Sequence, residues 1–580
     1  MIRKVLDLIG DESDLSASLE DMSLNDEAAF QLLCGTQVGG IPYLEGARAR
    51  DLLLKWQPRQ WQDLIALLAL VRPVALESGL TESFLRTRQD GQPEESLPPS
   101  RDKRPGAGTA FLLFDVDLTR LIVRTTGWSL EKADELCRIM MKGEEKAEDL
   151  RPEFIESAEG KGCDREQAET TWSTLERSAG VVANRSKTVA QGLTVLQAAF
   201  LKARFPEHYM AALLSSELRQ HDLLAAHVEV CGRENLRLLP PDINGSGVEF
   251  TVETEGIRLG LAAVRHVSRA AAAAIVQARR ERGPFHSLFE LISSVEREHL
   301  GKRALDGLIK AGALDSFRCG RQQLHDMLPE AVEQARRGQM ALFDRCDMES
   351  QSVPSSSPAV EWDEATKVSR EKEALGFYLS GHPLSEFKAL VEELAPGGTA
   401  RLGDLPGDSQ SRLGGVVEEI RMVSSRKGEP LRFLRLEDFN GSAEVVVFAD
   451  VHAEYQRYIY QGALLLVSGR IAKESGQVRL VADEIMLLEE AAADMASSVH
   501  LKLTVEGLSG EPLKELKQLL KTHPGSCPVY LHFGVGQQTV VVQKLPTSFR
   551  IRPNKELQVR LTKQFGKDCL EVRYEEPHAA

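Results

Sequence analysis

Cysteine is scarce in this sequence, and no two cysteines are close enough to form a C-x-x-C pair. This spacing argues against a zinc ribbon and against a redox motif of the thioredoxin type. Isolated, reduced thiols are therefore the expected state of all of them. The eight cysteines are Cys34, Cys137, Cys163, Cys231, Cys319, Cys346, Cys527 and Cys569.

Long apolar runs are absent as well. No stretch approaches the roughly 18 apolar residues of a membrane span. The N-terminal segment MIRKVLDLIGDESDLS has no apolar core followed by a small-residue cleavage site. The sequence thus predicts neither a membrane protein nor a secretory signal, and the cytoplasm is the expected compartment.

The sequence also lacks net positive charge. Its formal charge at pH 7 is −15, whereas a protein that grips nucleic acid by charge alone is usually basic. Any contact with DNA must therefore be local, and the acidity is also compatible with a platform for other proteins. With 580 residues, 42% hydrophobic and 27% charged, the chain is long enough for about three to five globular domains.

What the sequence does contain predicts a mixed, multidomain fold that is mainly helical at first and richer in strands later. Apolar residues recur at helical spacing before residue 240, and short alternating strands separated by turns follow from 412. The predicted parts are a helical segment (1–88), a Pro- and Gly-rich linker (89–109), a helical region (110–237), a domain of paired helices (238–338), a short peptide (339–343), a Ser- and Pro-rich linker (344–362), a helical connector (363–400), a β-barrel (412–488) and a small α/β domain (498–576).

The paired helices carry the local positive charge that DNA binding would need. Residues 256–320 contain eleven Lys and Arg against six Asp and Glu. Their tight turns predict helix-hairpin-helix elements, which bind the phosphate backbone through turn amides and basic side chains. Ser268 stands where the first turn normally has glycine, and a helical spacer with solvated arginines is the alternative. The predicted DNA contacts are Arg265, Arg269, Lys302, Arg303, Lys310 and Gly312.

The segment 412–488 predicts a small barrel of the OB-fold type. Asn440-Gly441 and Ser475-Gly476 lie where hairpin turns belong. Such barrels bind single strands through stacking aromatics and a basic groove, although a purely structural role is the alternative. Phe433 could equally be a core residue, because it alternates with Leu434. The predicted DNA contacts of the barrel are Arg426, Lys427, Arg432 and Phe433, with Arg435 beside them.

A short peptide at the edge of the Ser- and Pro-rich linker has the pattern of a docking motif. A glutamine followed by spaced apolar residues and an aromatic can enter a hydrophobic groove, where its amide fixes the register. The alternative is a helix end that packs on its own domain. The predicted docking residues are Gln339, Met340, Leu342 and Phe343.

Many separate blocks, in order, resemble the bacterial replicative DNA polymerase III alpha subunit, a C-family polymerase. The resemblance covers essentially the whole chain, as its C-terminal half with diverged fingers. The blocks are RPVALESGL (72–80), GWSLEKADELCRIMMKG (127–143), AFLKARFPEHYMAALLSSEL (199–218), LLPPDINGSGVEFTVE (238–253), GIRLGLAAVRHV (256–267), GPFHSLFEL (283–291), KRALDGLIKAGALDS (302–316) and EKEALGFYLSGHPL (371–384).

The resemblance assigns roles to the parts. It implies a palm or thumb remnant in 1–88 and a fingers-like region in 110–237. It further implies that the peptide binds the sliding clamp (beta subunit) and that 498–576 meets the clamp-loader tau subunit. The aspartates that hold two magnesium ions precede this region in the family. We therefore expect no catalytic residue, metal or cofactor on this chain, and Mg²⁺ only if another chain supplies the palm.

The nucleotide-facing parts depart from the family pattern. The segment GIPYLEG (40–46) has Pro42 and Tyr43 where the family has Phe and Gln, and GVVANRSKT (180–188) departs similarly. The resemblance implies a nucleotide-binding remnant made of Asn184, Arg185, Ser186 and Lys187. Asp115 and Asp117 suggest a metal pair, but they occupy the place of a helical finger segment that binds no catalytic metal.

Three functions follow as hypotheses. In the first, the chain is a polymerase-derived factor of DNA replication or repair that binds DNA and the clamp without polymerising alone. In the second, it is part of a split DNA polymerase, a nucleotidyltransferase whose palm lies on an upstream polymerase chain. In the third, it is a decayed fragment. The drifted fingers favour the first over the second.

Overall fold

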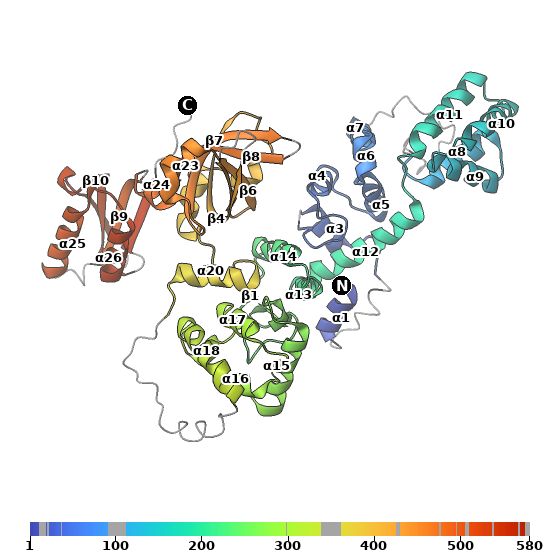
Figure 1. Cartoon of the computed structure of the whole chain (residues 1–580). Helices are drawn as coiled ribbons and strands as arrows, with labels where there is room; N and C mark the ends of the chain where they lie inside the picture. The colour runs from blue at the N-terminus through green and yellow to red at the C-terminus, as the bar shows by residue number, and fades with distance from the viewer. Residues whose placement is uncertain are drawn as a thin grey trace. The chain divides into compact units, whose positions relative to one another are not determined.

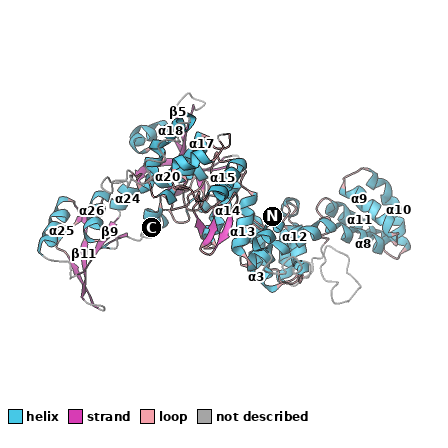
Figure 2. Ribbon diagram, turned by 90° about the horizontal axis from the view of Figure 1, so that it is seen from below, coloured by secondary structure: helices cyan, strands magenta, loops and turns pink. Residues whose placement is uncertain are grey.

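The structure is a computed structural model, and it divides into two compact units. The first comprises Met1–Trp362 with Glu373–Phe377, and the second comprises Asp363–Lys372 with Tyr378–Ala580. Figures 1 and 2 show that helices make up more of the chain than strands do. The structure describes residues 1–10, 19, 22–35, 37–90, 112–296, 298–337, 361–424, 430–474, 477–494, 496–504, 510–535, 539–566 and 569–574.

The first unit begins with short helices, as the apolar periodicity predicts. Leu52 and Trp56 in one helix, and Leu64 and Leu67 in the next, are buried because apolar residues three to four positions apart share a helix face. The helices are α1 (Ile2–Ile9), α3 (Glu27–Cys34), α4 (Ala47–Trp56), α5 (Trp61–Leu70), α6 (Pro73–Glu77) and α7 (Leu80–Asp90).

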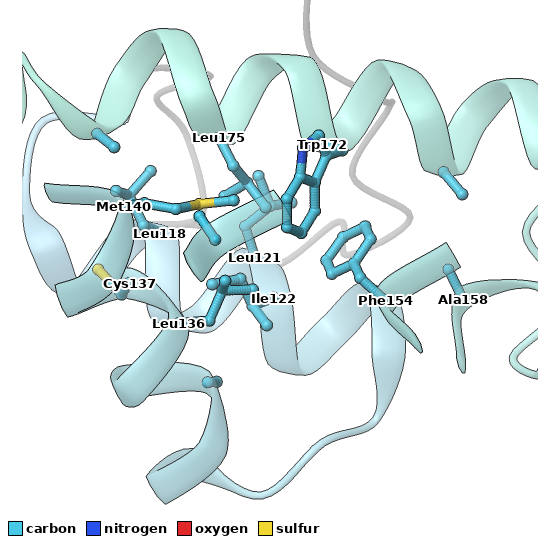
Figure 3. Close-up of a cluster of buried hydrophobic side chains, with 14 of the residues drawn as sticks. Leu118, Leu121, Ile122, Leu136, Cys137, Met140, Phe154, Ala158, Trp172 and Leu175 are labelled. Carbon is cyan, nitrogen blue, oxygen red and sulfur yellow. The ribbon is translucent and has the colours of Figure 1, made fainter. Parts of the chain in front are cut away.

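Four further helices surround an aromatic core (Figure 3). Phe154 packs edge-on against Trp172 and Trp128, with ring centroids 5.2 and 6.1 Å away. Ser129 is the N-cap of the second of these helices, because its Oγ accepts a hydrogen bond from the Lys132 amide at 3.3 Å. The helices are α8 (Asp115–Thr126), α9 (Leu130–Met141), α10 (Lys146–Gly160) and α11 (Arg165–Ala179).

A buried cation ties the next helices to the N-terminal segment. The Lys202 ammonium donates to the carbonyls of Gln37 (3.0 Å) and Gly39 (2.6 Å) and pairs with Glu234 at 2.6 Å. Its side chain is 1% exposed, so all of its charge is compensated within the protein. The helices are α12 (Arg185–Arg204), α13 (Pro206–Ser216) and α14 (His221–Arg233).

The predicted domain of paired helices follows a small three-stranded sheet of order β1-β3-β2. Strands β1 and β3 are parallel, and β2 and β3 form an antiparallel hairpin. The elements are β1 (Leu238–Leu239), β2 (Thr251–Glu253), β3 (Gly256–Arg258), η2 (Leu261–Ala263), α15 (Arg269–Arg282), α16 (Leu288–Ser294), α17 (Lys302–Lys310), η3 (Asp315–Phe317) and α18 (Arg321–Arg337).

The second unit contains the predicted barrel, which is closed in the order β4-β5-β6-β8-β7. Strand β7 pairs back onto β4, and β6 and β8 are the parallel pair. The turn predicted at Asn440-Gly441 joins β5 to β6. The elements are α20 (Glu364–Leu375), η4 (Ser385–Phe387), α21 (Lys388–Leu394), α22 (Gly398–Leu402), β4 (Gln410–Ser424), β5 (Pro430–Glu437), β6 (Ser442–Val447), α23 (Ala449–Tyr455), η5 (Gln456–Tyr458), β7 (Leu464–Glu474), β8 (Gln477–Leu487) and α24 (Leu488–Asp494).

The chain ends in the predicted small α/β domain. Its sheet has the order β12-β11-β9-β13, and its helices pack through Leu516 and Leu561 against Leu501 and Leu531 of the strands. The elements are β9 (Ala496–Thr504), α25 (Gly510–Thr522), β10 (Pro524–Cys527), β11 (Val529–Val535), β12 (Thr539–Lys544), η7 (Thr547–Phe549), α26 (Lys555–Phe565) and β13 (Leu570–Tyr574). In the described part of the chain, no helix combines the length and apolar character that a membrane span needs.

Candidate nucleic-acid interface

The first hairpin is the turn between η2 and α15. Ser268, which stands where glycine is expected, has an ordinary φ of −70° and caps α15, its Oγ accepting a hydrogen bond from the Ala271 amide at 3.1 Å. The left-handed conformation falls instead on His266, with φ +67°. Sequence reasoning missed this residue. The available signal was its position two residues before the helix cap, within a tight turn.

Backbone hydrogen bonds and a neighbouring helix hold the first hairpin in place. The Arg265 amide donates to the carbonyl of Ala374 at 2.7 Å, and the turn is closed by a 3.1 Å hydrogen bond from the Val267 amide to the Val264 carbonyl. Helix α17 packs against the same turn, because a Cβ on Gly307 would lie only 2.8 Å from the Arg265 carbonyl oxygen. These contacts fix the direction in which the turn points.

Two predicted DNA contacts, Lys302 and Arg303, occupy the first turn of α17, whose N-cap is Gly301. Both are exposed, and within the described residues neither side chain makes a hydrogen bond or an ion pair. Cations at a helix N-terminus are unfavourable, because the amides there already carry partial positive charge. Helix stability therefore gives no reason for this placement, whereas an anionic ligand would.

Lys310 lies in a different environment. Its residue is 7% exposed, and its ammonium pairs with Asp306 at 2.8 Å and Glu373 at 2.7 Å. Burial alone would lower the pKa of Lys310, but the two carboxylates raise it. The predicted role of Lys310 as a DNA contact is therefore not supported, since its charge is already compensated.

Gly312 also has a local structural role. It has φ +79° and ends α17: its amide donates to the Ile309 carbonyl at 3.0 Å, and the Ala313 amide donates to Leu308 at 2.9 Å. A Cβ there would lie 2.3 Å from the Arg321 guanidinium. Because its amide is already bonded within the helix end, Gly312 is not placed to donate to a phosphate.

The remaining predicted contacts in this domain are partly committed to internal partners. Arg269, with a half-exposed side chain, pairs with Glu249, and the same carboxylate pairs with Lys4 at 3.0 Å. The Arg265 guanidinium is near the Glu373 carbonyl at 3.4 Å. Both arginines flank His266, so the first hairpin remains a positively charged surface.

The outer face of the barrel carries an aromatic ring among arginines. Phe433 is half-buried and lies outside the barrel core; it stands opposite Arg421 of β4 and Val446 of β6. The Arg479 guanidinium lies 5.5 Å from its ring centroid. Glu444 sits between the two arginines, 2.8 Å from Arg421 and 2.5 Å from Arg479. The face therefore combines a stacking ring with partly compensated positive charge.

The other predicted barrel contacts differ in what the structure shows of them. Arg432 is half-buried opposite Met422, and Arg435 is exposed and pairs with Glu418 at 3.1 Å. Arg426 and Lys427 lie outside the described residues, as do the docking residues Gln339, Met340, Leu342 and Phe343.

The nucleotide-binding remnant lies at the N-terminus of α12. Asn184 caps this helix, and Arg185, Ser186 and Lys187 in its first turn are exposed. The Asp115 carboxylate accepts hydrogen bonds from the Asn184 amide side chain at 2.7 Å and from the Arg185 backbone amide at 3.1 Å. An internal carboxylate thus occupies the positive end of α12.

Asp117 is similarly occupied. It accepts hydrogen bonds from the backbone amides of Phe114 at 3.0 Å and Leu113 at 3.3 Å, which caps α8. Burial raises the pKa of Asp117, opposed by these hydrogen bonds. Asp115 and Asp117 therefore serve two helix ends rather than one shared site. The described residues contain no group of three or more His, Cys, Asp or Glu arranged to hold a metal.

Comparison with known families matches three parts of the chain. Residues 1–162 match the bacterial DNA polymerase III alpha subunit finger domain, residues 235–324 match a helix-hairpin-helix motif, and residues 412–488 match an OB-fold nucleic acid binding domain. The last two matches cover the domain and the barrel described above.

Curated relatives named DNA polymerase III subunit alpha align with nearly the whole chain. The protein from Pseudomonas aeruginosa is 30% identical over 96% of this chain and 50% of its own length. Those from Escherichia coli K12 and Mycobacterium tuberculosis are 29% and 27% identical, over 95% and 97% of this chain. The chain spans about half the length of these relatives. It belongs to the family of the bacterial DNA polymerase III alpha subunit.

Proposed function

We propose that this chain binds DNA in replication or repair and does not extend primers by itself. The observation that carries the proposal is the pair of exposed cations at the N-terminus of α17, Lys302 and Arg303, beside the firmly held first hairpin. Such a surface suits phosphates, which fix a protein on DNA without reading its sequence. We expect this activity in the cytoplasm.

The barrel supplies a second proposed contact, to single strands. Phe433 offers a ring for base stacking, and Arg421, directly opposite it on β4, and Arg479 place positive charge beside it. Stacking of this kind tolerates any base. Together with the helix-hairpin-helix domain, the barrel would hold both duplex and unpaired DNA.

The duplex contact can be tested with the double variant Lys302→Gln, Arg303→Gln. We expect weaker binding to a fluorescent duplex. The negative slope of log affinity against log salt should become shallower by about 2, because each phosphate contact contributes about 0.9. Fluorescence anisotropy at several salt concentrations measures both quantities.

A matched control removes two other exposed cations. Arg138 on α9 and Lys142 directly after this helix each have a side chain that is 70% exposed, and Arg138→Gln with Lys142→Gln changes the net charge equally. This control should bind as the parent does. Equal affinity and equal salt slope in the Lys302, Arg303 variant and the parent would disprove the proposed contact.

We further propose that residues 339–343 bind the sliding clamp and that the C-terminal domain, residues 498–576, meets the clamp-loader tau subunit. The support is the motif itself and the order of domains shared with the alpha subunit family. Leu342→Ala with Phe343→Ala should abolish pull-down of the clamp, because both apolar anchors are lost. Met348→Ala, just beyond the peptide, is the control, and undiminished pull-down of the double variant would remove the peptide from the proposal.

A second candidate is a split polymerase in which another chain supplies the palm and Mg²⁺. The match of residues 1–162 to the alpha subunit finger domain favours it. The occupation of the α12 terminus by Asp115 weighs against it, because a triphosphate at Asn184–Lys187 would have to displace that carboxylate.

A further inference from the structure

We infer that His266 is itself a DNA-contacting residue: its imidazole binds a backbone phosphate at the tip of the first hairpin. This inference rests on the proposed DNA-binding function and adds a residue to it. The turn would be easiest to form with glycine, which adopts positive φ without a steric penalty. The chain has histidine there, with φ +67°.

The conformation of His266 has no helix-ending explanation. Among the other described non-glycine residues with positive φ, Gln57, Asn235 and Arg318 follow helix ends, which is a common use of the left-handed conformation. Tyr43 and Asp408 lie in loops, as His266 does. His266 instead lies in the turn that leads into α15, one residue after the helix-facing Arg265. A strained residue in a turn that points outward is a reason to look for a ligand.

The imidazole is also uncommitted. His266 is exposed, and among the described residues no side chain or backbone group hydrogen-bonds or ion-pairs with its ring. Its neighbours differ in this respect, because Arg269 pairs with Glu249 and Arg265 contacts the backbone of Glu373. An imidazole always carries at least one N–H donor, and phosphate oxygens are strong acceptors.

The surroundings fix the backbone of the turn that carries the ring. The Arg265 amide is bonded to Ala374, Gly307 of α17 packs against the Arg265 carbonyl, and Ser268 caps α15 on the other side. A ring on a rigid turn loses little additional freedom when it binds. Lys302 and Arg303 lie on the helix that supports this turn. One stretch of the DNA sugar-phosphate backbone could therefore contact His266, Lys302 and Arg303 together.

The test compares His266→Gly with His266→Asn in the full-length chain. His266→Gly should relieve the backbone strain and raise the melting temperature, yet weaken duplex binding by about three- to tenfold, the worth of one hydrogen bond. His266→Asn tolerates the same φ and keeps a donor, so it should retain most of the affinity. Anisotropy and thermal melting measure the two effects.

Gln57→Gly is the matched control, because it relieves a left-handed residue far from the hairpin in sequence and alters no charge. It should raise stability without changing DNA affinity. The His266→Gly variant could bind duplex as tightly as the parent while the Lys302, Arg303 variant binds more weakly. That result would overturn the inference about His266 and leave the proposed DNA-binding function standing. A parent chain that binds no DNA would overturn the proposed function as well.

Discussion

Single buried ionic residues hold the N-terminal segment in place. Lys202 is enclosed by two carbonyls and Glu234, and His227 lies between Glu217 (2.6 Å) and Glu45 (3.1 Å). Burying such charges is costly unless every one is paired. Here each is paired, so these residues join segments that are more than 150 positions apart in the sequence.

His227 gives stability a definite pH dependence. Burial disfavours its protonation, but hydrogen bonds with Glu217 and Glu45 prevail and raise the pKa of His227 to about 9. The folded pKa lies above the unfolded value of about 6.5. The stabilisation is therefore complete below about pH 6.5 and is lost as the pH rises toward 9, by at most about 3 kcal/mol.

We expect the melting temperature of the parent chain to fall between pH 6.5 and 9 more steeply than that of His227→Gln. Thermal melting followed by circular dichroism across that range measures the difference. His221→Gln on the same helix is a suitable control and should keep the parent's profile. If the melting temperatures of the parent and of His227→Gln change with pH in the same way, Glu217 and Glu45 do not raise the pKa of His227.

At the scale of elements, several helices begin with a cation, which is the wrong charge for their own dipole, and three of these helices belong to the candidate sites. Arg269 starts α15, Lys302 starts α17 and Arg185 starts α12. Each placement is worth a few tenths to about 1 kcal/mol against the helix. At α12 the carboxylate of Asp115 accepts a hydrogen bond at the helix N-terminus and compensates the positive charge there. At α17 no described residue does, which is why we assign the DNA contact there.

The α8–α11 bundle depends on its aromatic core. The Phe154 ring is fully buried and lies beside Trp172 (Figure 3), and it also packs edge-on against Trp128. Phe154→Ala removes it and leaves a cavity, so we expect a loss of about 3–5 kcal/mol of stability. Tryptophan fluorescence during urea unfolding follows this bundle through Trp128 and Trp172 when the other three tryptophans are replaced by phenylalanine. Leu130→Ala, at a residue that is 67% exposed, should have little effect, and an equal loss in both variants would contradict this account.

At the scale of the whole molecule, binding surfaces are local features on an acidic chain of net charge −15. The exposed cations of the helix-hairpin-helix domain must act over short distances, since overall repulsion opposes the approach of DNA. We therefore expect DNA affinity to fall steeply with salt.

The purified 580-residue chain should incorporate no deoxynucleotide into a primed template with Mg²⁺ present. The physical reason is that Asp115 and Asp117 are bonded at two helix ends and are not arranged as a metal pair. A gel-based primer extension assay measures this. Incorporation by the chain alone would refute the proposal, whereas incorporation only after adding a palm-bearing chain would establish the split polymerase.

Much of the architecture could be predicted from the sequence, because it depends on local periodicity. Alternating residues after 412 indicated the barrel, and helical spacing indicated the N-terminal helices. The family followed from many ordered blocks. These features can be predicted because each depends on residues that are close together in the sequence.

The tertiary structure alone decided which predicted site residues are available. Lys310 and Lys302 are alike in sequence, yet one is enclosed by Asp306 and Glu373 and the other is exposed. Likewise, the sequence marked a tight turn before α15, but the fold was needed to show that Ser268 caps the helix and that His266 has the left-handed conformation. Long-range contacts set the burial, the pairing and the backbone angle of a residue, and no local pattern encodes them.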